Sequence, residues 1–301
     1  MTNSITDRGA VQQRSYVVTG ADTGLGRAVA RRLASGGRVI TCGLGTEMDI
    51  CADLTTIEGR RALVERAATL CGGRVDGVVA AAGIGAPAPD TVSLNHFGAI
   101  AVLEGLRSYL AASQAPAAVV VSSSSTLNAG SRVLVRACAQ GDEARARAIA
   151  HRLTRIGLGS QIYRSSKIAL NQWVRRTAVT NEWTAAGIVL NAVAPGIIAT
   201  DQVMRTWEQD RDLLETALPQ PLGVPGPVEP VADLIACTVS AENRFMTGQI
   251  IYCDGGTDAL MRGFRPQRIF LRYSARDIVT MLRAAHRGRQ AGRPGEDVHL
   301  D

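Results

Sequence analysis

The sequence predicts an α/β fold built on a doubly wound parallel sheet with helices on both faces. Short, continuous apolar runs alternate along the chain with longer segments of helical periodicity. The runs lack the apolar–polar alternation of a half-exposed strand, as is typical of parallel strands buried on both faces. The first run ends in a glycine and is followed by a helical pattern, as in a strand–turn–helix unit. Together these observations favour one large domain.

The predicted elements follow one another in a regular order. Residues 16–20 form the first strand, and the next helix places Ala28, Val29, Ala30 and Leu33 on one apolar face. Further strands are predicted at 38–42, 77–82, 117–121, 187–192 and 248–253, and further helices at 57–71, 95–112, 163–180 and 228–240. This alternation predicts a single domain over residues 12–262.

Two segments interrupt the alternation. Residues 127–160 separate a strand from the next core helix, and 141–150 is rich in strong helix formers. We interpret this segment as a helical insertion. Residues 263–301 form an Arg-rich C-terminal extension. We expect it to be partly helical, because Ser274 can act as an N-cap before a periodic apolar pattern.

Composition excludes several classes of protein. Of 301 residues, 46% are hydrophobic and 20% are charged, which allows a sizeable buried core. No uncharged apolar window reaches about 18 residues, so no membrane-spanning helix is predicted. The start of the chain lacks the apolar segment of a secretory signal. Six scattered cysteines without a C-x-x-C pair predict neither a disulfide framework nor a metal site, and we expect a cytoplasmic protein.

The basic charge is concentrated at one end of the chain. Residues 262–301 hold nine Arg and four acidic residues, whereas the rest holds 24 basic and 23 acidic residues. A basic tail alone is weak support for nucleic-acid binding, so no such partner is expected. Of 33 basic residues only Lys167 is a lysine. Because Arg and Lys differ in size and donor geometry, this single ammonium marks a position worth a functional interpretation.

A glycine-rich turn lies between the first strand and its helix, with the sequence Thr19-Gly20-Ala-Asp-Thr-Gly24-Leu-Gly26. Glycine allows a tight turn and a close backbone approach, and the helix N-terminus favours phosphate oxygens. Such a motif is weak alone, but here it has the strand–turn–helix context of a dinucleotide-binding turn. The alternative is a tight turn without a ligand.

Tyr163 and Lys167 are separated by four positions, so in a helix they share one face. A free phenol has a pKa of about 10, and a nearby cation is expected to lower it. Such a tyrosine can exchange a proton with a carbonyl or an alcohol oxygen. The alternative is an exposed tyrosine beside an ordinary surface lysine.

A serine run that includes Ser123 follows another buried strand, at the sheet edge where open sheets bind ligands. The alternative is an ordinary polar loop.

These residues, taken in order, resemble the short-chain dehydrogenase/reductase family over about residues 14–262. The resemblance rests on the glycine-rich turn, Asp53-Leu54, Ala81-Ala-Gly83, Asn95, Ser123, Tyr163-x-x-x-Lys167, Pro195-Gly196 with Thr200, and Asp254-Gly-Gly256. It implies a Rossmann-type NAD(P)-binding catalytic domain and transfer of a hydride between a nicotinamide cofactor and a secondary alcohol or ketone.

The resemblance also implies roles for individual residues. Tyr163 would be the general acid/base, and Ser123 would hold the substrate oxygen. Lys167 would lower the pKa of the tyrosine and bind the nicotinamide ribose, and Asn95 would hold a water of a proton relay. The cofactor contacts implied in this way are Gly20, Thr23, Gly24, Leu25, Gly26, Gly43, Asp53, Leu54, Ala82, Gly83, Tyr163, Lys167, Pro195, Gly196, Ile198 and Thr200. Of these, Asp53 and Leu54 would border the adenine, and Ile198 and Thr200 would meet the carboxamide.

Within the family, the sequence is most similar to the bacterial 3α-hydroxysteroid dehydrogenase/carbonyl reductase branch. Ser123 and Tyr163 are unusually far apart, and that branch has a comparable Glu/Ala/Arg-rich insertion. The resemblance implies a homodimer or homotetramer and an apolar steroid-like or polycyclic substrate. We expect residues 202–227 to form a lid, with Val203, Met204, Trp207, Leu213 and Leu214 available for apolar contact.

Three features depart from the family pattern. The acid that NAD-selective members carry at the end of the second strand is absent near Gly43, and no Arg replaces it. NAD(H) and NADP(H) therefore both stay open, with NAD slightly favoured by the branch. The usual asparagine after the predicted strand at 77–82 is replaced in the run Ala80-Ala-Ala-Gly83. The basic tail is an addition.

Two alternative functions stay open from the sequence. One is a biosynthetic ketoreductase acting on a polyketide or terpenoid, which would use the same residues. The other is a non-catalytic dinucleotide-sensing scaffold that uses the tail as a contact arm. The tail could pack as a solvated helix or subunit arm, or bind an acidic partner or an anionic membrane surface; we favour the former.

Overall fold

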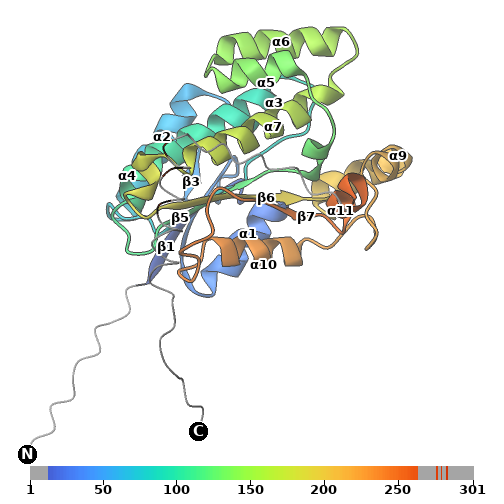
Figure 1. The fold of residues 1–301 in the computed structure, drawn as a ribbon. Helices are drawn as coiled ribbons and strands as arrows, with labels where there is room; N and C mark the ends of the chain where they lie inside the picture. Colours follow the sequence, from blue (N-terminus) through green and yellow to red (C-terminus); the bar gives the residue numbers. More distant parts are fainter. Residues whose placement is uncertain (1–12, 264–275, 277–278, 280–282, 284–301) are drawn as a thin grey trace, which may run out of the picture. The chain divides into compact units, whose positions relative to one another are not determined.

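The computed structural model describes residues 13–263 together with Arg276, Val279 and Arg283. Seven strands form one sheet in the order β3-β2-β1-β4-β5-β6-β7, and each neighbouring pair is parallel (Figure 1). The strands are β1 (Arg14–Thr19), β2 (Gly37–Gly43), β3 (Ile50–Cys51), β4 (Gly77–Ala80), β5 (Ala117–Val121), β6 (Val189–Pro195) and β7 (Ile250–Cys253). The predicted α/β fold with a doubly wound parallel sheet is confirmed.

Helices cover both faces of this sheet (Figure 1). The face with α1 and α10 buries a cluster that includes Val29 and Ile235, and the opposite face buries Leu63, Leu103 and Leu170 from α2, α4 and α7. The helices are α1 (Gly24–Ala34), α2 (Ile57–Leu70), α3 (Pro89–Val92), α4 (Ala99–Leu110), α5 (Arg132–Ala139), α6 (Glu143–Arg155), α7 (Ser160–Thr177), α8 (Asn181–Thr184), α9 (Asp201–Ala217), α10 (Glu229–Thr238) and α11 (Thr257–Arg262), with a π-helical segment η1 (Ser93–Gly98) and a 3₁₀ turn η2 (Ser124–Leu127).

The direction of winding reverses between β1 and β4. From β1 the chain builds outward to β2 and β3, then crosses back to β4 and continues to β7. In open parallel sheets, ligands bind outside the carboxyl ends of the strands at such a reversal. The carboxyl ends of β1, β4 and β5 are therefore the expected floor of a binding site.

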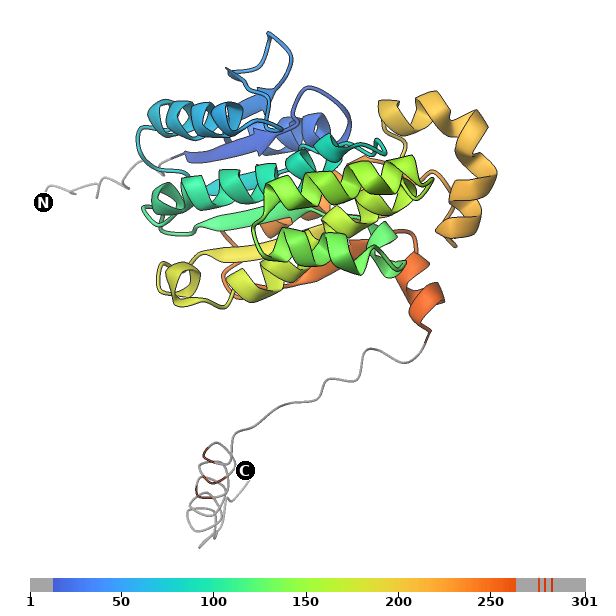
Figure 2. The same cartoon turned by 90° about the horizontal axis from the view of Figure 1, so that it is seen from above.

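The segment predicted as a helical insertion, residues 127–160, contains the two helices α5 and α6. Leu134 and Ala146 from these helices are buried against Ile162 of α7, outside the layer that covers the sheet (Figure 2). The buried Arg60 of α2 bonds both carboxylate oxygens of Glu143 at 2.7 and 2.8 Å, which ties the first turn of α6 to the core layer. The insertion is therefore an integral layer of the domain.

Several element bounds differ from the sequence expectation, and some elements were not predicted. The strand predicted at 187–192 extends instead from Val189 to Pro195, because Asn191 is satisfied inside the sheet by Met246 O and Gln249 N. The short edge strand β3 and the helix α9 were not predicted. A two-residue strand leaves no periodicity to detect, and α9 occupies the segment that the sequence predicted only as a lid.

The chain forms two compact units, residues 1–261 and 262–301. The helix predicted after Ser274 lies outside the described residues, apart from Arg276, Val279 and Arg283, which are helical. None of the described helices is long and apolar enough to cross a membrane. Within the same residues, no group of three or more His, Cys, Asp or Glu side chains could hold a metal ion. All six cysteines are free thiols.

Candidate active site

The glycine-rich turn forms a cradle at the carboxyl end of β1. Gly20 has φ +66°, and a Cβ on it would lie 2.8 Å from the Cα of Ala82 in the loop after β4. Leu25 and Gly26 are buried at the start of α1, and Thr23 is its N-cap residue. No side chain caps this helix, and its first turn contains no acidic residue. Its N–H groups are thus available to an anion, which fits a pyrophosphate.

The loop after β4 is held against the cradle by two polar side chains. Ala82 N donates to Thr19 Oγ1 at 3.0 Å, which braces the loop where the usual asparagine is missing. Asn95, buried in η1, bonds Ile84 twice: its amide accepts from Ile84 N and donates to Ile84 O, both at 2.9 Å. The family resemblance implies a water beside this amide, and in the structure the amide fixes the loop that contains Gly83.

Gly83 lies close to the side chains of both Asn95 and Lys167. A Cβ on Gly83 would lie 3.1 Å from Asn95 Oδ1 and 3.4 Å from Lys167 Nζ. The ammonium is almost fully buried and donates to Val121 O, at the end of β5, at 2.7 Å. It also lies 5.9 Å from the centre of the Tyr163 ring, so the two side chains share one face of α7 as predicted.

Ser123 joins this group from the turn after β5. It is the N-cap residue of η2, and its Oγ accepts from Ser125 N at 3.1 Å. A hydrogen bond also links its side chain to the Tyr163 hydroxyl. The four residues predicted as catalytic therefore converge from η1, η2 and α7 on the carboxyl edge of β5. The neighbouring Ser122 donates to Asn171 Oδ1 of α7 at 2.6 Å, which anchors the turn.

Burial changes the proton affinities of this pair in a way that the sequence did not predict. It raises the pKa of the Tyr163 phenol, and the hydrogen bond with Ser123 opposes that shift. Burial also lowers the pKa of Lys167 from 10.5 to about 8. The pKa of the phenol is thus raised rather than lowered, because the loss of water around the phenolate outweighs the hydrogen bond with Ser123.

The segment after β6 lies over the glycine-rich turn. A Cβ on Gly24 would lie 3.3 Å from Cγ2 of Thr200, so the start of α1 meets this segment. Gly196 N donates to Cys253 O at 3.1 Å, and Ile198 pairs with Gly226. Pro195, Gly196, Ile198 and Thr200 therefore stand at the carboxyl edges of β6 and β7, beside the cradle.

The residues predicted near the adenine lie around β2 and β3. Leu54 is buried, and a Cβ on Gly98 of η1 would lie 3.4 Å from its Cβ. The Asp53 carboxylate accepts from Thr55 N at 2.9 Å and from Thr55 Oγ1 at 2.7 Å, which shapes the turn before α2. Gly43 ends β2, and a Cβ on it would lie 2.6–2.8 Å from the carboxylate atoms of Asp22.

Two residues at the site were missed by sequence reasoning. The Gln220 amide bonds both the N–H and the carbonyl of Ile197, and donates to Gly223 O at 3.0 Å, so it braces the segment after β6. No local pattern marks it, because the Ile197 backbone that it braces is 23 residues away in the sequence. Asp22 stands inside the glycine-rich motif, and its position was visible, but only the fold shows that it faces Gly43.

The expected lid is the helix α9, which lies at the end of the sheet to which the strands run (Figure 2). Trp207, expected to be free for a ligand, is buried instead in a small cluster with Ile197 and Leu218. Met204 is 48% exposed and stays available for an apolar contact. The side chains of Leu213 and Leu214 lie outside the described residues.

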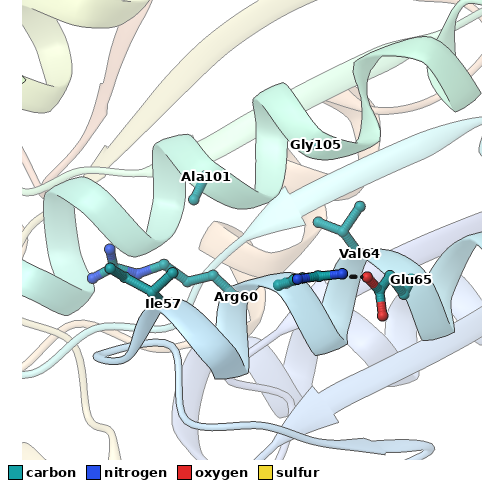
Figure 3. A pocket seen from close by; sticks show the side chains of 7 residues that line it. Ile57, Arg60, Val64, Glu65, Ala101 and Gly105 are labelled. Atoms are coloured by element: carbon teal, nitrogen blue, oxygen red, sulfur yellow. Dashed lines mark hydrogen bonds and ion pairs between the residues drawn. The ribbon is translucent and has the colours of Figure 1, made fainter.

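A groove of about 410 Å³ lies elsewhere, between α2 and α4 (Figure 3). Ile57, Arg60 and Val64 line one side, and Ala101 and Gly105 line the other. No residue predicted for catalysis or cofactor binding borders it. We therefore assign the groove no part in the site.

The comparisons with known proteins agree with this geometry. A family model described as enoyl-(acyl carrier protein) reductase matches residues 20–258. The chain is 33% identical over 253 residues to a 3-alpha-hydroxysteroid dehydrogenase/carbonyl reductase of Comamonas testosteroni, covering 82% of this chain and 97% of that protein. It is 29% identical to a tropinone reductase homologue of Arabidopsis thaliana, covering 83% of this chain and 91% of that protein.

A solved structure gives a similar result. The structure of a 3-alpha-hydroxysteroid dehydrogenase from Pseudomonas sp. B-0831, complexed with NADH, is 35% identical. It superposes with a TM-score of 0.76 and covers 84% of this chain and 100% of that one.

Proposed function

The chain belongs to the short-chain dehydrogenase/reductase family, and we propose that it interconverts a secondary alcohol and a ketone with Tyr163 as general acid/base. It is an oxidoreductase that resembles hydroxysteroid dehydrogenases and carbonyl reductases. The observation that carries the proposal is the placement of Ser123, Tyr163 and Lys167 at the carboxyl edge of β5, beside an uncapped helix N-terminus. A proton-exchanging group and a phosphate cradle thus share one edge of the sheet.

The residues around the cradle fit a nicotinamide dinucleotide. Gly20 lies close to Ala82, and Gly83 lies close to Lys167. Because these glycines have no side chain, the backbone surface here stays open to a ligand. The free N–H groups at the start of α1 would hold the pyrophosphate, and Lys167 would hold ribose hydroxyls. The segment from Pro195 to Thr200 would hold the carboxamide. When bound, the cofactor supplies or accepts the hydride.

Side chains of the protein would transfer the proton to and from the substrate oxygen. Tyr163 Oη would give a proton to the substrate oxygen during reduction and take one during oxidation. Ser123 would hold that oxygen, since its hydroxyl already bonds the phenol. A phenol whose pKa is raised is protonated at neutral pH, which is the form that reduction needs. Asn95 would keep the Gly83 loop in place through its two bonds to Ile84, in addition to the water-holding role implied by the family.

The substrate proposed is an apolar steroid-like or polycyclic alcohol or ketone. Support comes from the hydroxysteroid dehydrogenase names of two relatives and from the exposed Met204 on α9. We further propose one catalytic domain over residues 12–262, a homodimer or homotetramer, and a cytoplasmic location. The insertion supports the first point, because it is packed against α7, which contains Tyr163 and Lys167.

Replacement of Tyr163 by Phe tests the mechanism. The variant keeps the ring and loses the hydroxyl, so NADH or NADPH binding, followed by nicotinamide fluorescence, should persist. Turnover with a panel of cyclic and steroid ketones should fall by roughly 10²- to 10⁴-fold. Tyr109→Phe is the matched control, since Tyr109 packs against the core at α4, and it should retain full turnover. Retained turnover in Tyr163→Phe would show that another group transfers the proton.

A further inference from the structure

The end of β2 has an unusual arrangement. Its last residue is Gly43, which has no side chain, and the space beside it is taken by the carboxylate of Asp22 from the glycine-rich turn. A Cβ on Gly43 would lie 2.6 Å from Asp22 Cγ and 2.8 Å from each of its oxygens. A carboxylate thus stands at the end of β2 although the strand itself does not provide one.

This position has a defined role in dinucleotide-binding folds. A carboxylate at the end of the second strand accepts hydrogen bonds from the adenosine ribose hydroxyls of NAD, whereas an Arg there accommodates the 2′-phosphate of NADP. A carboxylate has about four acceptor sites on its two oxygens. Asp22 Oδ2 uses one to accept from Leu44 N at 3.0 Å. Oδ1 accepts no hydrogen bond from the described part of the chain, so acceptor sites remain for a ribose diol.

The charges around this corner disfavour a phosphate. The segment 39–59, which includes the end of β2, β3 and the turn before α2, has four acidic residues and no Lys or Arg. A Cβ on Gly45 would meet the Glu47 carboxylate at 2.6 Å, so a second negative group lies near Gly43. Arg27 of α1 is already paired with Asp201 at 3.0 Å. A 2′-phosphate placed here would face like charges with no cation of this segment to balance it.

We propose that Asp22 replaces the missing β2 carboxylate, binds the adenosine ribose diol and makes this enzyme selective for NAD(H) over NADP(H). The proposal rests on the proposed function, because it assumes that the cradle binds a nicotinamide dinucleotide. It resolves the ambiguity that Gly43 leaves in the sequence. The selectivity comes from the glycine-rich turn, and the strand end only provides the space.

Binding of NADH and of NADPH to the whole purified protein, followed by nicotinamide fluorescence, tests this without any substrate. The unchanged protein should bind NADH at least roughly a hundredfold more tightly than NADPH. Asp22→Asn keeps an oxygen that can accept from Leu44 N and removes the charge. It should weaken NADH binding roughly tenfold to a hundredfold, as expected for loss of a charged acceptor, and strengthen NADPH binding.

Two further variants separate the role of Asp22 from a general charge effect. Glu47→Gln removes a neighbouring charge and should change the NADH/NADPH ratio less than about threefold. Asp22→Ser combined with Gly43→Asp moves the carboxylate back to the strand end and should restore NADH selectivity. Gly43→Asp alone should weaken NADH binding, because its side chain would meet the Asp22 carboxylate.

The outcomes distinguish failure of this inference from failure of the proposed function. If the unchanged protein binds neither nucleotide, the dinucleotide site itself is wrong. If it binds NADPH as tightly as NADH, or if Asp22→Asn leaves the ratio unchanged while both still bind, the dinucleotide site stands and the assignment of Asp22 is overturned. A gain in NADPH affinity also shows that the Asp22→Asn protein is folded, so that result cannot arise from misfolding.

Discussion

Lys167→Met should relieve a pH-dependent cost of folding. Burial lowers the pKa of this ammonium from 10.5 to about 8, and each pKa unit corresponds to about 1.4 kcal/mol. Burial of the charged ammonium therefore lowers the free energy of unfolding by about 3 kcal/mol below pH 8. Met has a similar length and no charge, so it removes this cost. It also leaves Val121 O without its donor, which costs about 1–3 kcal/mol at every pH.

The sign of the pH dependence follows from proton uptake. Between about pH 8 and 10.5 the unfolded chain binds the lysine proton while the native protein has lost it. Stability therefore rises with pH across this window. The free energy of unfolding of the unchanged protein, minus that of Lys167→Met, should increase by about 2–3 kcal/mol from pH 7 to pH 10. Contributions from other titrating groups occur in both proteins and cancel.

Two measurements check this. Because the chain has one lysine, protein labelled with ¹³C-lysine gives a single lysine Cε resonance, whose pH titration reports the native pKa directly. Urea unfolding from pH 7 to 10, at fixed protein concentration, reports the stability difference. Arg176→Met, on the exposed face of the same helix, removes a guanidinium from the surface and should give a flat difference. A Cε midpoint at or above 10, with a flat Lys167→Met difference, would refute the reasoning.

Further predictions concern the proton donor, the insertion and the cradle. Burial raises the pKa of Tyr163, and alcohol oxidation needs the phenolate. Oxidation should therefore accelerate as pH rises through the alkaline range, and ketone reduction should slow. A rate profile for oxidation that is flat from pH 7 to 10 would contradict this. In urea titrations, Glu143→Ala should lower the free energy of unfolding by about 2 kcal/mol, because it leaves the buried Arg60 with backbone carbonyl partners only. The control Glu65→Ala breaks an exposed ion pair and should lower it by less than about 0.5 kcal/mol. Gly20→Ala should lower the free energy of unfolding by about 1–3 kcal/mol and abolish NADH binding, because Gly20 has a positive φ and lies against Ala82. Thermal melting measures the first effect and fluorescence titration the second. An unaltered NADH affinity would show that the cradle does not bind the dinucleotide.

Local sequence patterns were sufficient for much of the fold and for the placement of Tyr163 beside Lys167. Continuous apolar runs identified β1, β4 and β5, because a strand buried on both faces has no polar position. The spacing of Tyr163 and Lys167 placed them on one helix face, since a helix repeats every 3.6 residues. The glycine-rich turn identified the cradle, because a turn with positive φ and close backbone contact requires glycine.

The tertiary structure decided what depends on partners that are distant in sequence. The pKa directions of Tyr163 and Lys167 are set by burial, which no local pattern encodes. Gln220 acts through backbone groups of Ile197, and Trp207 is buried by Leu218 rather than exposed for a ligand. Asp22 faces Gly43 only because β1 and β2 are adjacent in the sheet. The sequence by itself determined the fold class and the shared helix face of Tyr163 and Lys167, because both follow from short-range periodicity. The environment of that pair, and the charge at the end of β2, depend on which distant segments the folded sheet places side by side.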